Sequence, residues 1–67
     1  MLSARNQFRG VVKSVKFGGV MAEVVVTVGN LEIVSAITRT SAETLGLQVG
    51  DEVRTIIKST EVMIDKP

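Results

Sequence analysis

Apolar and polar residues alternate with a period of two through most of this chain, and this alternation strongly restricts the folds it can adopt. A period of two is typical of β-strands, whose successive side chains point to opposite faces of a sheet. In the strand predicted over 21–28, one face holds Ala22, Val24, Val26 and Val28, and the other holds Met21, Glu23, Val25 and Thr27. Both faces are partly apolar, whereas a sheet with one face in water is apolar on one side only.

The same pattern predicts a first strand over 7–17 and further strands over 31–38, 52–59 and 60–65. Their second faces also carry apolar residues, which predict contacts between subunits; across the predicted sheet these residues are Val25, Val34, Ile56 and Met63. The competing interpretation is that they are scattered surface hydrophobes, which soluble proteins commonly expose. We favour the subunit contacts.

The chain is short for the amount of aliphatic surface that it carries. It has 67 residues, among them 12 Val and 5 Ile, and no Cys. A domain of this size buries only roughly 60% of the surface that its unfolded chain exposes, so a lone monomer is marginally stable. Because disulfides are excluded, a ligand or an oligomer must supply the missing stability, and the aliphatic excess favours the oligomer.

Turn and cap signals set the order of the predicted elements. Gly29-Asn30 suits a two-residue type II′ hairpin, which makes the second and third strands antiparallel neighbours. A capping box at Thr40-Ser41-Ala42-Glu43 predicts a short helix that ends at Gly46, with Leu47 folding back in a Schellman motif. Three strands, a short helix and two strands are the order of a five-stranded OB-like barrel. We therefore expect an all-β small barrel in a single domain over 1–67.

The composition argues against catalysis. The chain has neither His nor Cys, which removes the usual general base, thiolate nucleophiles and soft-metal sites. Its 7 carboxylates are dispersed, without a paired-acid motif. A net charge of +1 gives little electrostatic attraction to DNA or an anionic membrane, and no stretch is long enough to span a membrane. We expect a soluble cytoplasmic protein that is not an enzyme and has neither a nucleic acid nor a membrane as its partner.

Two short clusters combine a fixed positive charge with hydroxyl or amide donors, and neither contains an acidic residue. They are Ser3-Ala4-Arg5-Asn6 before the first strand and Lys58-Ser59-Thr60 between the last two. A site made only of donors suits a fully deprotonated oxyanion, whereas an anion that keeps a proton benefits from a carboxylate acceptor. Charge-assisted hydrogen bonds are the stronger kind, so a few converging donors can hold a dianion.

These clusters, with the intervening segments, resemble the molbindins, or Mop domains, which are small molybdate-binding proteins of the TOBE class. The resemblance includes S-A-R-N-Q at 3–7, A-I-T at 36–38, L-G-L at 45–47, G-D-E-V at 50–53 and I-K-S-T-x-V-M at 57–63. It implies an OB-like fold in a homohexamer arranged as a trimer of dimers, with molybdate or tungstate bound at subunit interfaces. Stand-alone Mop domains are thought to store or buffer the oxyanion inside the cell.

The resemblance also implies roles for individual residues. Ser3 and Arg5 would donate from one side, Thr38 would supply a hydroxyl, and Lys58 would supply the charge, with Ser59 adding backbone or hydroxyl contacts. Ala4 and Asn6 are weaker candidates, as backbone or indirect contributors. The chain departs from the family pattern at Glu61, where a small polar residue is common, and at Gly29-Asn30, where the family often has a longer turn.

The expected function is therefore reversible binding and storage of molybdate or tungstate, without a further cofactor, a directly coordinated metal or a reaction. Two alternatives remain open at this point. An OB-type nucleic-acid-binding module would need stacking aromatics, and the chain has only Phe8 and Phe17. A swapped-hairpin transcription regulator would explain the turn over 46–53 but neither end cluster.

Overall fold

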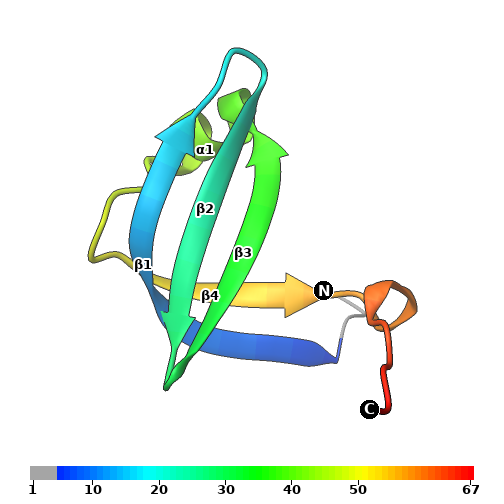
Figure 1. Ribbon diagram of the computed structural model, residues 1–67. Helices are drawn as coiled ribbons and strands as arrows, with labels where there is room; N and C mark the ends of the chain where they lie inside the picture. The colour runs from blue at the N-terminus through cyan, green and yellow to red at the C-terminus, as the bar shows by residue number, and fades with distance from the viewer. Residues whose placement is uncertain (1–4) are drawn as a thin grey trace.

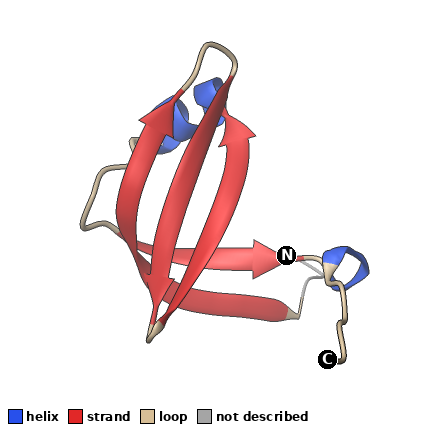
Figure 2. Cartoon of the chain, in the orientation of Figure 1, coloured by secondary structure: helices blue, strands red, loops and turns tan. Residues whose placement is uncertain are grey.

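The structure is a computed structural model that describes residues 5–67 of the chain, and it consists of a curved antiparallel sheet with one short helix (Figures 1 and 2). The elements are β1 (Asn6–Phe17), β2 (Met21–Val28), β3 (Leu31–Thr38), α1 (Arg39–Leu45), β4 (Glu52–Ile57) and the 3-10 turn η1 (Ser59–Glu61). The strand order in the sheet is β3-β2-β1-β4. The small barrel with its helix after the third strand is confirmed.

Strand β1 belongs to both halves of this barrel. Its first half pairs with β4, from Asn6 opposite Ile57 to Val11 opposite Glu52, and its second half pairs with β2, from Val11 to Phe17. A β-bulge between Val12 and Ser14 separates the regularly paired parts. Bulges bend a strand and increase its twist. Figure 1 shows the result, in which β4 and the start of β1 cross the direction of β2 and β3.

The core lies between these crossing layers. Its buried cluster is Val12, Val24 and Val26, and the residues packed against it are Val15, Val28, Ile37, Leu47 and Val53. Ala22 and Ala42 are buried as well. The face of β2 that sequence alternation predicted to be apolar is thus the one that faces the core, and Leu47 and Val53 close it from the segment after α1.

The second-face residues are much less covered. Met63 is 93% exposed and Val34 63%, while Ile56 is 39% exposed and Val25 is half-buried. Further large apolar side chains are exposed on this chain, among them Val20, Leu31, Leu45, Val49 and Ile64. A chain of this size with so few buried side chains leaves apolar area for another surface to cover. The subunit contacts remain a prediction.

Two turn predictions, the hairpin at Gly29-Asn30 and the helix end at Gly46, are confirmed. β2 and β3 form a hairpin in which Val28 pairs with Leu31, and Gly29 has a φ of 60°, as the first central residue of a type II′ turn requires. Gly46 ends α1 in the left-handed conformation, and Leu47 N–H donates to the Ala42 carbonyl at 3.2 Å in a Schellman arrangement.

The predicted capping box is wrong. Thr38, not Thr40, is the N-cap of α1, and its hydroxyl oxygen accepts the Ser41 N–H at 3.1 Å. The helix therefore begins at Arg39, directly after β3, and Thr40 lies inside its first turn. The reason is that Thr38 is the last extended residue, with φ −68° and ψ 147°, which is the backbone conformation that an N-cap needs.

The predicted fifth strand is absent from residues 5–67. β4 ends at Ile57, and the Glu61 N–H donates to the Lys58 carbonyl at 2.9 Å, which turns the chain at η1. Residues 62–67 continue without strand pairing inside the described chain. Consequently β3 and β4 are the edges of the sheet that residues 5–67 form, and this part of the barrel is open between them.

Gly10 allows β1 to pass close to β2. A Cβ at this position would lie 2.5 Å from the Thr27 carbonyl oxygen and 2.7 Å from Val26 Cγ1. We predict that Gly10→Ala lowers the free energy of unfolding by about 1–3 kcal/mol, because the backbone at Thr27 must move. Urea denaturation measures the effect.

Gly19→Ala is the matched control, since a Cβ there meets nothing within 4 Å. Its unfolding free energy should stay within about 0.5 kcal/mol of the parent chain. Equal effects at the two glycines would contradict the proposed close approach of β1 to β2.

Candidate functional site

The two donor clusters of the sequence meet where β1 begins and β4 ends. Asn6 pairs with Ile57, and the Asn6 Nδ2 donates to the Ile57 carbonyl at 3.3 Å. Arg5 and Lys58 are the next residues of these two segments beyond the last pair, and both side chains are exposed. Ser3 and Ala4 lie outside the described residues. Segments more than fifty residues apart in sequence are thus neighbours at this end of the sheet.

Lys58 and Ser59 lie at the turn that follows β4. Lys58 is the extended residue before η1, with φ −64° and ψ 139°, and Ser59 begins the turn. Glu61, the departure from the family pattern, is exposed and shares with Lys58 the end of the groove between β3 and β4. No ion pair joins these two side chains within the described part of the chain. The Lys58 ammonium is therefore available to an anion.

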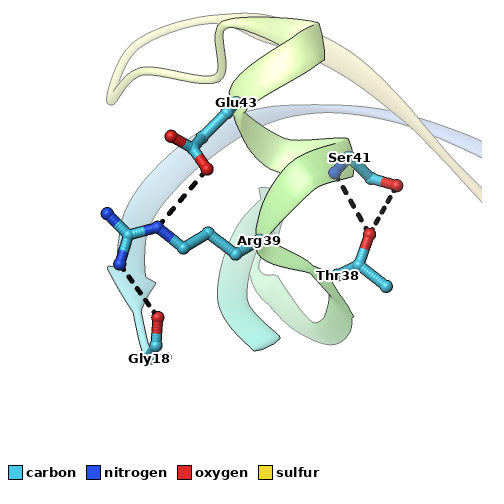
Figure 3. Close-up of polar contacts among 5 residues, drawn as sticks. All are labelled: Gly18, Thr38, Arg39, Ser41 and Glu43. Atoms are coloured by element: carbon cyan, nitrogen blue, oxygen red, sulfur yellow. Dashed lines mark hydrogen bonds and ion pairs between the residues drawn. The ribbon is translucent and has the colours of Figure 1, made fainter. Parts of the chain in front are cut away.

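Thr38 lies at a different end of the same chain. It ends β3 beside α1, whereas Lys58 follows the end of β4, and Figure 1 shows the ends of these two strands well apart. Its hydroxyl accepts from the Ser41 N–H and donates to Ser41 Oγ at 2.7 Å (Figure 3). One chain does not bring Thr38 to Lys58. A site that uses both residues needs Thr38 from one copy and Lys58 from another.

Arg39, the residue after Thr38, joins the start of α1 to the turn between β1 and β2, and sequence analysis missed it. Its Nη1 donates to the Gly18 carbonyl at 3.1 Å, and its Nε lies 3.3 Å from Glu43 Oε1 (Figure 3). Its guanidinium also lies 5.3 Å from the centre of the Phe17 ring. The backbone N–H of Arg39 donates to the Val20 carbonyl at 2.8 Å. The i, i+4 spacing of Arg39 and Glu43 was the only sequence signal for this arrangement.

A groove of about 690 Å³ runs along the opening between β3 and β4. Its wall is mainly apolar, with Lys58, Glu61, Arg54 and the hydroxyls of Ser35 and Thr55 as the polar groups. Residues 5–67 hold no group of three or more carboxylates able to bind a metal ion. Among those residues, no helix has the length and apolarity needed to cross a membrane. This groove offers an apolar wall with a few charged and hydroxyl groups, which can bind and orient a ligand.

Comparison with known proteins gives the family. The model described as TOBE domain matches residues 2–64. The chain belongs to the TOBE domain family. This TOBE domain is 48% identical over 64 residues to Molybdenum-pterin-binding protein 3 of Clostridium pasteurianum, covering 94% of each chain. Its resemblance to the molbindins is thereby confirmed.

Solved structures agree with the sequence relatives. This TOBE domain matches a molybdate binding protein from Sporomusa ovata with a TM-score of 0.94 and 38% identity, over 98% of both chains. It matches the cytoplasmic molybdate-binding protein ModG, in a form with molybdate bound, with a TM-score of 0.83 and 38% identity. That match covers 88% of this chain and 43% of ModG. The OB-like barrel therefore belongs to a family of molybdate-binding proteins.

The capping role of Thr38 generates a prediction that is independent of any ligand. Thr38→Ala should destabilise the TOBE domain by about 0.5–2 kcal/mol, because the Ser41 N–H loses its acceptor. Thr38→Ser keeps the acceptor and should recover most of the loss. Thermal unfolding without oxyanion measures both.

Thr40→Ala is the control that separates the two candidate caps. Thr40 is exposed inside α1, where Ala has the higher helix propensity, so the variant should be neutral or slightly more stable. A larger loss at Thr40 than at Thr38 would restore the capping box predicted from sequence.

Proposed function

We propose that this TOBE domain binds molybdate or tungstate reversibly at interfaces between copies of the chain, with donors from Arg5, Asn6, Lys58 and Ser59 and a hydroxyl from Thr38. Ser3 and Ala4, outside the described residues, belong to the same proposed site. The observation that carries the proposal is the pairing of Asn6 with Ile57, which gathers both donor clusters at one end of the β1–β4 ribbon.

The chemistry of these groups favours a deprotonated dianion. Ammonium, guanidinium, amide and hydroxyl groups all donate, and molybdate offers only acceptor oxygens. A tetrahedral oxide of this size can accept from several directions at once, which suits donors that come from more than one chain. Sulfate is the smaller competitor, and it would leave some of these donors without a partner.

The proposed assembly is a hexamer arranged as a trimer of dimers. Its support is the exposed second face of the sheet, the unpaired edges of β3 and β4, and the separation of Thr38 from Lys58. A second chain could cover the exposed face, pair with the strand edges, and bring its Thr38 to Lys58 of the first. Because an interfacial ligand binds only the assembled form, molybdate should stabilise the oligomer by mass action.

The proposed role is storage or buffering of the oxyanion in the cytoplasm by a single domain over 1–67 that performs no catalysis. The match to the Clostridium relative, a molybdenum-pterin-binding protein, covers 94% of each chain, which supports a role in binding the oxyanion. The structural relative ModG is a cytoplasmic molybdate-binding protein, which supports the same location here.

Removing the proposed charge tests the site. Lys58→Ala should weaken molybdate binding by at least about tenfold, since hydrogen bonds to charged groups are the most costly to lose. Lys66→Ala is the matched control, because Lys66 is an exposed lysine of the segment after η1. Titration calorimetry with molybdate, tungstate and sulfate measures the affinities, and equal affinity of both variants would refute the assignment.

Native mass spectrometry with and without molybdate tests the interface. We expect six copies per particle and an unfolding temperature that rises with molybdate concentration. A monomer that binds molybdate with full affinity would disprove the interfacial site.

The nucleic-acid alternative gives a different result in the same experiments. Phe8 and Phe17 are 41% and 45% exposed, and the Arg39 guanidinium lies over the Phe17 ring, so few aromatic faces are offered for base stacking. Saturable binding of an oligonucleotide without any response to molybdate would favour that alternative.

A further inference from the structure

Two arginines face each other on the outer side of the β1–β4 ribbon. Arg9 pairs directly with Arg54 in the antiparallel register, and both side chains are exposed. Side chains in such pairs have Cβ atoms about 5 Å apart, and like charges directly opposite each other destabilise a sheet. Neither guanidinium takes part in an ion pair within residues 5–67. The arrangement concentrates two positive charges without a counter-charge bound to them.

The pair lies in a surface hollow of about 790 Å³ that is separate from the groove between β3 and β4, although Arg54 reaches both. The hollow is lined by Arg9, Gly10, Val11, Thr27, Gly29, Glu52, Val53 and Arg54. The hydroxyl of the half-buried Thr27 makes no hydrogen bond within the described chain, and it is a further donor. Gly29 has open space at its Cα, so it does not block the approach of a ligand.

Glu52 makes this hollow chemically different from the donor cluster at Lys58. It is the next outward-facing residue before Arg54 on β4, about 7 Å along the strand. Its carboxylate forms no ion pair with Arg9 or Arg54 in the described structure, which leaves its oxygens available as acceptors. The hollow therefore offers two guanidinium forks, one hydroxyl and one acceptor.

We propose that Arg9, Arg54, Thr27 and Glu52 form a second anion site, selective for hydrogen phosphate over sulfate and distinct from the site at Lys58. Guanidinium groups bind phosphate oxygens through paired hydrogen bonds, and one dianion between two of them replaces a repulsion with two attractions. Near neutral pH hydrogen phosphate keeps one O–H group, and this group can donate a hydrogen bond to the Glu52 carboxylate. Sulfate has no proton to donate, so it meets that carboxylate as a repulsive charge.

The test is a phosphate titration of the full chain carrying Lys58→Ala, followed by amide and arginine Nε NMR shifts at constant ionic strength set by chloride. This background weakens the proposed molybdate site, so that shifts at Arg9, Thr27, Gly29 and Arg54 report on the second site. We expect saturable shifts at Arg9, Thr27, Gly29 and Arg54, and weaker binding of sulfate.

Two variants separate the contributions. Arg54→Gln should lower phosphate affinity by at least about tenfold, as expected for loss of a charge-assisted pair, while folding is retained because it removes a like-charge contact. Glu52→Gln should bring sulfate affinity to within about threefold of phosphate affinity, because the repulsive charge is gone. Lys66→Gln, which removes one charge elsewhere on the surface, should change neither affinity.

Four results would overturn the proposal. The first is a linear, non-saturating shift that chloride reproduces, and the second is an equal loss in Arg54→Gln and Lys66→Gln. The third is a phosphate preference that survives Glu52→Gln, which would remove the carboxylate from the selectivity. Binding of an oligonucleotide at Arg9 and Arg54 in place of phosphate would equally reject a small-anion site.

Discussion

The pairing of β1 with two partners is the constraint on which the rest of this molecule depends. One strand of 12 residues supplies the hydrogen bonds for β4 over its first half and for β2 over its second. It does so by bending where Gly10 lies against Thr27 and where the bulge follows Val12. The bend folds the sheet over Val12, Val24 and Val26, and it carries the start of β1 to the end of β4. The bend in β1 thus forms the core and also brings the segment at Asn6 beside the end of β4.

The sheet that this pairing produces is an open barrel, with a gap between β3 and β4. β3 and β4 are both edges, and unpaired edges present backbone groups that another chain can pair with. Few side chains are buried, while Met63 and Ile64 are 93% and 88% exposed. A single chain therefore leaves strand edges and apolar side chains that a second chain could cover. In the proposed function, the ligand binds at such an interface between chains.

The sequence pattern predicted most of the strands and the helix. It predicted less well where one element ends and the next begins. Period-two alternation identified β2 and β3 with their correct bounds, and Gly46 marked the end of the helix. The start of the helix was misplaced because Thr38 and Thr40 are both good caps, and only the end of β3 decides between them. The fifth strand was predicted from alternation alone, which records the pattern of side chains but not the presence of a partner strand.

The residues proposed for the site come from the sequence, and their site stays a prediction, whereas the arrangement of the two segments comes from the structure. Donor-rich composition pointed to Arg5, Asn6 and Lys58, yet their proximity follows from the β1–β4 register, a long-range property. Arg9 and Arg54 are cross-strand partners in the same register. The sequence did not predict this pair, because the register is a long-range property. Arg39 was missed because three of its contacts, to Phe17, Gly18 and Val20, come from another hairpin.

The bulge in β1 has an effect on how the length of this strand can change. Before it, Gly10 and Val12 face inward; after it, Val15 and Phe17 lie opposite the inward-facing Val24 and Ala22. The extra residue thus reverses which numerical parity points to the interior. Deleting the extra residue, Lys13, would give a regular strand in which Val12 and Val15 still lie opposite Val26 and Val24, but the strand would lose the bend that the bulge supplies. A one-residue deletion at this position should therefore change the curvature of the barrel and leave its two faces as they are.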